Sequence, residues 1–407
     1  MKKVATFAAL ALAVTIGGLS SAPAATAAPS PAPQTLNASA ADVRAGTMDG
    51  FKRHLAEEVA RRLGERQFRD ALTRELADDG EADLAALLGS APGARDLADY
   101  ARNANSEILK LKGLQAEESL LQIRIDPKQV KRISAGETLV MATPSGDEKA
   151  VRTVVAFDSK GRSQQLDAFK APNRPVLIVG LDEHKDAELA QRAVRQGLTA
   201  AGIGGTDRSG PEQLQQNEGD RARAEQIQQN AGVQTGTEAL QQGAAAVRQT
   251  TDIVAIENLN SHEPWYKGGP EIYAFVAGAG TDGKARVDQI WMPYIQQQGK
   301  NYFPNQTLIE WGSFLWTNVD VVWMEHDDSV DLGPLVKAVV DGALTVTGYG
   351  QYTPVADKII GALPSDWTTD NDDYVDSCYN VGKFQGTLSC AANPAGMWTY
   401  VYVKTSS

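Results

Sequence analysis

Two short acidic stretches hold the side chains of this sequence whose types and spacing are best suited to chemistry. Each has the pattern acidic-x-Asp-Asp-x-x-Asp, and the first directly follows an apolar run at residues 321–324. Carboxylates spaced in this way on a tight loop can turn several oxygen atoms toward one cation. The candidate ligands are Glu325, Asp327, Asp328, Asp331, Asp370, Asp372, Asp373 and Asp376.

The cation that these carboxylates would suit is Ca²⁺, a hard ion that takes about six to eight oxygen ligands. Neither stretch is an EF-hand, because both lack the glycine at the sixth position and the glutamate at the twelfth. The carboxylates of the two stretches would repel one another if the loops met without a cation between them. We therefore predict bound calcium. Solvated acidic turns are the alternative, since Asp is common in turns.

Other kinds of site find weaker support. His262 and His326 each lie beside carboxylates, but the chain has no H-E-x-x-H and no ligand pair at zinc spacing. It also has no G-x-S-x-G, and His184 fits an exposed helical turn as well as it fits a catalytic base. An extracellular hydrolase that uses a carboxylate pair or a metal-bound water stays open as the alternative function. A passive surface or matrix component is a third.

The acidic stretches belong to a C-terminal half in which strand signals dominate. Short β-branched or aromatic runs separated by Gly, Pro, Asn and Asp are expected as strands. They cover residues 253–259, 271–277, 285–292, 307–311, 320–324 and 398–403. Residues 334–344 and 354–363 each begin with Pro and repeat apolar residues at helical spacing, so two helices are expected between the acidic stretches. The pattern predicts a C2-like or jelly-roll β-sandwich with inserted helices.

The N-terminal half combines helices with a small sheet. Apolar residues recur at helical spacing over residues 42–76, 83–88 and 96–110. Period-two alternation then predicts strands at 120–125, 138–142, 151–157 and 175–180, followed by an amphipathic helix at 186–201. We therefore expect an α+β multidomain chain. Its expected parts are a signal peptide (1–27), a disordered leader (28–40), a helical and small α/β domain (41–206), a Gln-rich linker (207–250) and the acidic β-sandwich domain (251–407).

The N-terminus predicts export. Basic residues at 1–3, an apolar stretch at 4–19 and an A-x-A site at 25–27 have the order of a secretory signal peptide. No later segment is apolar over the length that a membrane span needs. The only two cysteines, Cys378 and Cys390, are therefore expected to form a disulfide outside the cell.

Charge is concentrated in the C-terminal half. The whole chain has a net charge of −12, and residues 251–407 hold 19 Asp and Glu against 8 Lys and Arg. This imbalance argues against nucleic acid or an anionic membrane as a partner. All seven Trp lie in the same half. An unknown extracellular ligand, either a polysaccharide or a protein, is the partner that we expect.

One segment of the C-terminal half resembles a known family. Residues 263–274 read E-P-W-Y-K-G-G-P-E-I-Y-A, and the two acidic stretches follow later in the chain. The G-G-P-E-I-Y-A segment and both acidic stretches are similar to those of DUF3103, a family of secreted bacterial proteins with a domain of unknown function. The resemblance covers most of the mature chain. It implies a shared fold and implies no activity or catalytic residue.

Overall fold

The structure of the protein is a computed structural model. It describes residues 40–145, 151–210, 248–259, 264–326, 332–344, 359–361, 374–383 and 397–406. The predicted signal peptide, residues 28–39 of the predicted leader and residues 211–247 of the predicted linker lie outside these ranges. None of the described helices is both long and apolar enough to cross a membrane.

The predicted helices of the N-terminal half are confirmed. They pack through the apolar stripes that the sequence indicates. Leu55 and Val59 on the first helix, Leu63 directly after its end, and Phe68 and Leu72 on the second helix are fully buried. Burial of such a stripe supplies most of the stability of a helix in a folded protein. The four helices are α1 (Ala40–Arg62), α2 (Arg66–Glu75), α3 (Leu84–Ser90) and α4 (Arg95–Leu111).

A six-stranded sheet packs against these helices. Its strand order is β1-β2-β6-β3-β4-β5, and β3 and β6 form its parallel pair. The four predicted strands are present, whereas β1 and β5 were not predicted because β5 in particular is polar and largely exposed. The strands are β1 (Glu81–Asp83), β2 (Leu121–Arg124), β3 (Leu139–Ala142), β4 (Thr153–Phe157), β5 (Ser163–Asp167) and β6 (Val176–Leu181).

Two further sheets make up most of the described C-terminal half. A five-stranded sheet has the order β13-β12-β9-β10-β7, and a three-stranded sheet has the order β11-β8-β14. The two sheets share an apolar core that includes Ile256, Val276 and Trp323. The strands are β7 (Asp207–Ser209), β8 (Arg248–Asn258), β9 (Glu271–Ala279), β10 (Ala285–Trp291), β11 (Gln306–Glu310), β12 (Asn318–His326), β13 (Tyr374–Gly382) and β14 (Met397–Ser406).

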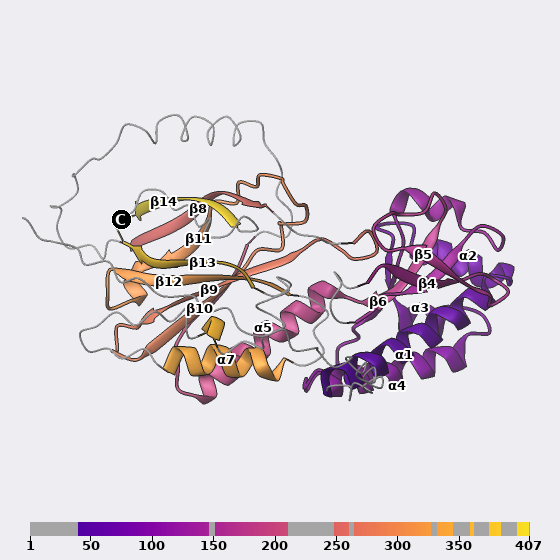
Figure 1. Cartoon of the computed structure of the whole chain (residues 1–407), viewed down its shortest axis with the longest axis horizontal. Helices are drawn as coiled ribbons and strands as arrows, with labels where there is room; N and C mark the ends of the chain where they lie inside the picture. The colour runs from indigo at the N-terminus through magenta and orange to yellow at the C-terminus, as the bar shows by residue number, and fades with distance from the viewer. Residues whose placement is uncertain are drawn as a thin grey trace, which may run out of the picture. The chain divides into compact units, whose positions relative to one another are not determined.

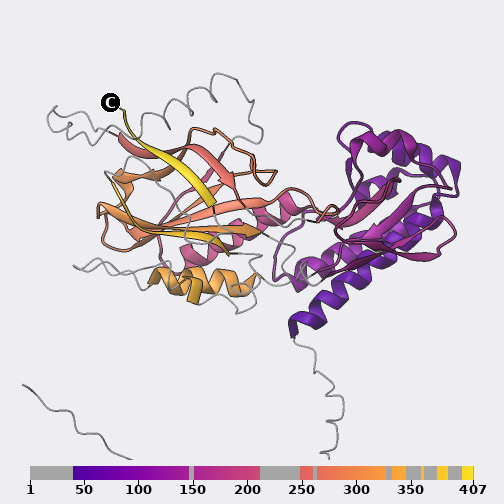
Figure 2. The ribbon, with the colours of Figure 1, turned by 45° about the horizontal axis from the view of Figure 1, so that its top comes forward.

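Helices α5 (Glu183–Ala200) and α7 (Gly333–Leu344) cover the other face of the five-stranded sheet. Figure 1 shows them on the side of β10 that faces away from β8, β11 and β14, and Figure 2 keeps the same order of layers. The predicted helix at 334–344 is thus confirmed. Most of the one predicted at 354–363 lies outside the described residues. The C-terminal half is therefore two packed sheets with one helix-covered face.

Two differences from the predicted strands concern the acidic stretches. Strand β12 continues beyond residue 324 to His326, and β13, which was not predicted, begins at Tyr374. Glu325 and Asp376 therefore lie in strands and not in loops. Asp is uncommon in strands, so the pattern of the second stretch indicated a turn. The backbone ladder between β12 and β13 overrides that local preference.

Candidate functional site

The two acidic stretches are attached to neighbouring strand ends. Strands β12 and β13 are antiparallel, and Met324 near the end of β12 pairs with Tyr374 at the start of β13. The chain therefore leaves β12 and enters β13 at the same end of the sheet, which we call the acidic end. Of the eight candidate ligands, Glu325 and Asp376 are described. Asp327, Asp328, Asp331, Asp370, Asp372 and Asp373 lie outside the described residues.

Asp376 ties the acidic end to the three-stranded sheet. Its carboxylate accepts a hydrogen bond from the N–H of Ser377 at 2.7 Å and another from the N–H of Met397, the first residue of β14, at 3.2 Å. The side chain is fully buried. A buried carboxylate is stable only when such donors replace its water, so Asp376 fixes the start of β13 against β14.

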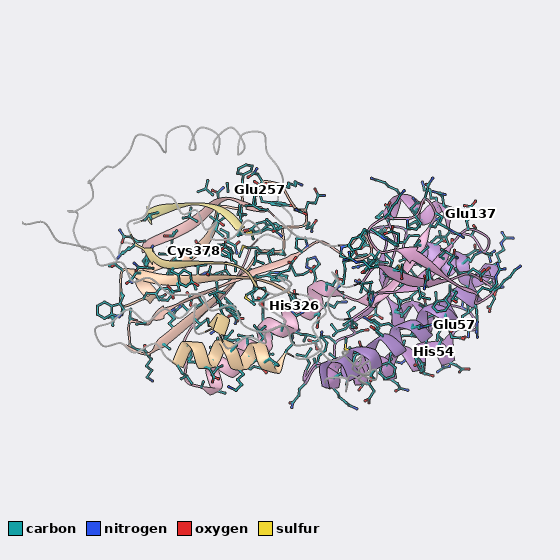
Figure 3. The ribbon with its side chains drawn as sticks, viewed as in Figure 1. His54, Glu57, Glu137, Glu257, His326 and Cys378 are labelled. Atoms are coloured by element: carbon teal, nitrogen blue, oxygen red, sulfur yellow. The ribbon has the colours of Figure 1, made fainter. Side chains whose placement is uncertain are left out.

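Glu325 and His326 point to opposite faces of the sheet, because successive side chains alternate along a strand. Trp323, two residues before Glu325, lies in the core between the sheets. His326 instead lies on the helix-covered face, where its Nε2 is 3.0 Å from Oδ2 of Asp186 on α5. Figure 3 shows His326 beside α5. Both side chains of the strand end are buried, Glu325 at 7% and His326 at 4% exposure.

Asp186 is shared by the ammonium group of a lysine and the imidazole of His326. The Nζ atom of Lys112, the residue that ends α4, lies 2.8 Å from the same Oδ2 atom that faces His326. Lys112 and Asp186 are fully buried. We call these three residues the Asp186 cluster. Attraction between opposite charges is strong where water is excluded, and a buried charge without its partner is strongly destabilising. The cluster therefore holds α4, α5 and β12 together.

The same region holds the chain on the far side of the first acidic stretch. The N–H of Leu332 donates a hydrogen bond to the carbonyl oxygen of Lys112 at 3.3 Å. His326 precedes residues 327–331 and Leu332 follows them. The residues on either side of 327–331 are thus both anchored near Lys112, one through the Asp186 cluster and the other through the backbone of Lys112.

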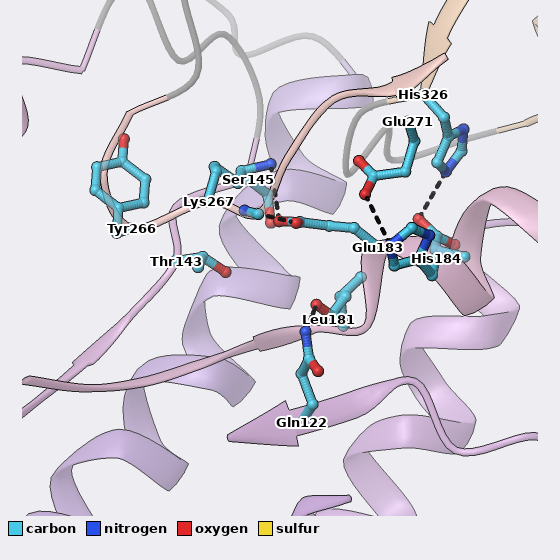
Figure 4. Close-up of polar contacts among 12 residues, drawn as sticks. Gln122, Thr143, Ser145, Leu181, Glu183, His184, Tyr266, Lys267, Glu271 and His326 are labelled. Atoms are coloured by element: carbon cyan, nitrogen blue, oxygen red, sulfur yellow. Dashed lines mark hydrogen bonds and ion pairs between the residues drawn. The ribbon is translucent and has the colours of Figure 1, made fainter. Parts of the chain in front are cut away.

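A second carboxylate and imidazole face each other beside the Asp186 cluster. Glu271, which pairs with His326 across β9 and β12, has its Oε1 atom 4.0 Å from Nε2 of His184. Figure 4 shows the Glu271 side chain beside that of His326, with a dashed line to His184. The His184 side chain is 52% exposed in the first turn of α5, with its ring edge against Trp291. The exposed-turn interpretation of His184 therefore fits its position.

The G-G-P-E segment is held by a buried ionic contact. The N–H of Gly268 donates to Glu183 Oε2 at 2.9 Å, and Arg124 Nη1 lies 3.1 Å from the same oxygen. Lys267 Nζ lies 3.7 Å from Glu183 Oε1, and Arg124 also donates to the carbonyl of Tyr266. A Cβ atom on Gly268 would lie 2.6 Å from Glu183 Oε2. This close approach explains why glycine occupies the position.

The Asp186 cluster is a poor place for a metal ion. Lys112 already occupies the carboxylate of Asp186, and a cation beside an ammonium group would be repelled. Among the residues that the structure describes, no three His, Cys, Asp or Glu side chains are grouped to hold a metal. His262, one of the two histidines weighed for zinc, lies outside them. The calcium site stays a prediction, and so does the disulfide, because Cys378 is described on β13 and Cys390 is not.

Three residues of this region were not picked out from the sequence. Lys112, Asp186 and Glu271 are far apart in the chain, and each looks like an ordinary surface charge on a helix end or strand start. The signal in the sequence that could have found Asp186 is its place in the first turn of an amphipathic helix, beside apolar residues of that helix. Only the packing of α5 against β12 brings it to His326.

Comparison with known proteins gives one match. A family model described as "Protein of unknown function (DUF3103)" matches residues 52–391, which is most of the chain. No curated protein and no solved structure matches. The match confirms the resemblance that residues 263–274 and the acidic stretches indicate. It assigns no activity to the site.

Proposed function

The chain belongs to the DUF3103 family of proteins of unknown function, and we propose that it is a secreted protein whose C-terminal half binds calcium at the acidic end. In this proposal the ion stabilises the acidic end and presents a surface for an extracellular polysaccharide or protein. Export is proposed from the basic, apolar and A-x-A order of residues 1–27.

One observation carries the proposal, the pairing of Met324 with Tyr374. It places side by side the ends of β12 and β13 from which the two acidic stretches continue, and in this proposal carboxylates from both stretches gather there. Such a concentration of negative charge is unfavourable unless a cation offsets it. Oxygen-only donors of this kind suit a hard cation that accepts many ligands, which favours calcium over zinc.

The anchoring of the acidic end also supports the proposal. His326 and Leu332 bracket residues 327–331, and each is bonded to a residue at the end of α4 or the start of α5. Asp376 holds the start of β13 through two backbone N–H groups. A metal site is more selective when the segments that supply its ligands start from fixed positions. We propose that the six carboxylates within residues 327–331 and 370–373 coordinate the ion. Glu325 and Asp376 lie where these segments join β12 and β13.

The proposal extends to the type of β-sandwich in the C-terminal half. Two packed sheets with functional loops at one end are the arrangement of C2-like and jelly-roll sandwiches, and the strand pairs here are antiparallel apart from β7 with β10. We propose this kind of sandwich for the C-terminal half, modified by the helices α5 and α7 on one face.

Thermal unfolding with and without calcium tests the proposal. Purified protein would be treated with chelator, and its melting temperature compared before and after addition of Ca²⁺, with Mg²⁺ as the matched control ion. Binding to the native state alone raises stability by about 2.7 kcal/mol at a hundredfold excess over Kd. We expect a rise with Ca²⁺ and a smaller one with Mg²⁺. An unchanged transition together with no calcium by elemental analysis would refute the proposal.

A further inference from the structure

A lysine of the first helix lies buried against two hydroxyl groups. The Nζ atom of Lys52 is 2.8 Å from Oγ of Ser145 and 3.3 Å from Oγ1 of Thr143. The same Nζ atom is 3.6 Å from Oδ1 of Asp49. The Lys52 side chain has no exposed surface, whereas Ser145 is partly exposed. We call these four residues the Ser145 site. They share no residue with the acidic end or with the Asp186 cluster.

The backbone around Ser145 is fixed on both sides. Asp49 and Lys52 are three residues apart on α1 and therefore project from the same face of the helix. Asp49 Oδ1 accepts the N–H of Ser145 at 2.7 Å, while Lys52 contacts its hydroxyl. The N–H of Thr143 donates to the carbonyl of Val179 on β6 at 2.9 Å. Ser145 is thus held by its backbone and by its side chain.

The Thr143 side chain packs tightly against Gly180 on β6. A Cβ atom on Gly180 would lie 3.0 Å from Oγ1 and from Cγ2 of Thr143. Glycine at position 180 therefore leaves room for the threonine side chain that contacts Lys52. Figure 4 labels both Thr143 and Ser145.

The Ser145 site lies at the carboxyl end of a strand in a parallel pair, a position where ligands commonly bind. Strands β3 and β6 are parallel, and Thr143 and Ser145 follow the carboxyl end of β3. Helix α5 begins just after the carboxyl end of β6. Crevices at the carboxyl ends of parallel strands are where α/β proteins most often bind ligands. A partly exposed hydroxyl beside a buried amine at such an end has the geometry of a nucleophile and its base.

We propose that Ser145 is a nucleophile and Lys52 its general base in an acyl-transfer site that acts on esters or amides. Lys52 in its amine form takes the proton of the Ser145 hydroxyl as Oγ bonds to the carbonyl carbon of the substrate. The tetrahedral intermediate collapses, the bond to the leaving group breaks, and Lys52 returns the proton to that group. Water then attacks the acyl-serine by the same route, which releases the acid and restores both side chains.

Asp49 and Thr143 are positioning residues in this proposal. The hydroxyl of Thr143 directs the lysine Nζ, and Asp49 fixes the Ser145 backbone. The Asp49 carboxylate also favours the ammonium form of its neighbour, which is the form that cannot accept a proton. Turnover is therefore expected to rise with pH. A lysine buried for structural reasons alone would make the same contacts but would give Ser145 no special reactivity.

A fluorophosphonate probe tests whether Ser145 is reactive. The probe phosphonylates an activated serine and releases fluoride, so the adduct is found by mass spectrometry of the digested full-length protein. We expect one adduct, on Ser145, and hydrolysis of p-nitrophenyl acetate above the uncatalysed rate. Ser145→Ala should abolish both. Ser163→Ala, which changes an exposed serine of β5, should change neither.

Variants of Lys52 and Asp49 separate catalysis from structure. Lys52→Met should lower the labelling rate about 100-fold or more, because it removes the base. Asp49→Asn should move the pH profile of labelling to lower pH, which a purely structural contact would not do. Circular dichroism would check that each variant folds. If Lys52→Met does not fold, the pH profile of Asp49→Asn tests the proposal in its place. Failure of folded wild-type protein to label at Ser145, or equal labelling in folded Lys52→Met, would overturn the proposal.

Discussion

The carboxylate of Asp186 and the imidazole of His326 lie 3.0 Å apart, although 140 residues separate them in the chain. Asp186 lies in the first turn of α5, in the N-terminal half of the sequence, and His326 is the last residue of β12, directly before residues 327–331. Lys112 completes the arrangement by facing the same carboxylate oxygen at 2.8 Å. The two halves of the sequence therefore meet in a buried ionic cluster at the end of β12. Helix α5 strengthens this connection, since its apolar residues enter the core of each half.

Asp186→Asn is expected to destabilise the protein by about 3–5 kcal/mol, because it removes the charge that faces the buried ammonium of Lys112. Lys112→Met should restore part of that loss when added to Asp186→Asn, since the double variant no longer buries a lone charge. Chemical denaturation of the four proteins in the cycle measures the coupling. Asp70→Asn, which breaks the exposed pair with Arg66, is the control and should cost less than about 1 kcal/mol. Additive losses would contradict the inferred coupling.

The sequence predicts the helices and most strands because their apolar residues recur with clear periods. Leu55 and Val59 mark α1, and the apolar run at residues 321–324 marks β12. Strand β13 was missed for a physical reason. Its first residues read as an acidic turn, and only pairing with β12 gives them a strand conformation. The Asp186 cluster was missed because distant charges that meet through packing leave no local pattern, whereas the acidic stretches do.

Gly268→Ala is expected to destabilise the protein by about 1–3 kcal/mol, as overpacking in a filled core does. The added methyl group would lie 2.6 Å from Glu183 Oε2 and would displace a carboxylate that Arg124 and Lys267 also face. Gly50→Ala on α1 is the matched control, because nothing lies within 4 Å of its Cβ position. That change should stabilise the helix by about 0.5–1 kcal/mol. Thermal unfolding distinguishes the two, and similar shifts would count against the packing explanation.

Two carboxyl groups should affect stability in opposite directions as pH changes. Partial burial raises the pKa of Glu81 above its ordinary 4.5, with Asp182 and Asp79 adding to the effect and Arg124 opposing it. A hydrogen bond from Arg192 lowers the pKa of Glu118 below the same value. Stability from Glu81 is therefore present below pH 4.5 and is lost as pH rises through its raised pKa. Stability from Glu118 is present above pH 4.5 and is lost as pH falls through its lowered pKa.

Substitution of Glu81 and of Glu118 by Gln should change stability in opposite directions, because their pKa values are shifted in opposite directions. Glu81→Gln should stabilise the protein slightly at pH 7, and Glu118→Gln should destabilise it, each by less than about 1 kcal/mol because both side chains are partly exposed. Both differences should shrink when unfolding is measured at acid pH, where the carboxyl groups are protonated in either state. An effect of Glu81→Gln that grows toward acid pH would contradict the assigned direction.

Cys378 and Cys390 are expected to be paired in protein purified under oxidising conditions. Cys378 is 6% exposed in the core between the two sheets. A disulfide that closes a short loop of this kind stabilises by about 3 kcal/mol, mainly by restricting the unfolded chain. Reduction should add the mass of two hydrogens and lower the melting temperature. The variant Cys390→Ser should melt at the same lower temperature with or without reductant. Intact protein that alkylates at both cysteines without reduction would refute the pairing.

Asp372→Asn and Asp376→Asn should affect the protein in different ways, although both remove one carboxylate from the same stretch. Asp376 is buried and accepts the N–H groups of Ser377 and Met397, so its amide variant should lower stability by about 1–3 kcal/mol even with chelator present. Asp372 is proposed to act on the ion alone. Its variant should leave the chelated protein unchanged and weaken the stabilisation that Ca²⁺ provides.

Calcium titrations monitored by thermal unfolding would measure both effects on one scale. The expected pattern is a displaced baseline for Asp376→Asn and a displaced calcium midpoint for Asp372→Asn, because the first change acts on the folded chain and the second on a ligand of the ion. Asp341→Asn, an exposed change on α7 that breaks only the pair with Lys337, is the control. Identical calcium midpoints for Asp372→Asn and wild type would remove Asp372 from the site. A baseline unchanged by Asp376→Asn would show that its two hydrogen bonds do not secure the start of β13.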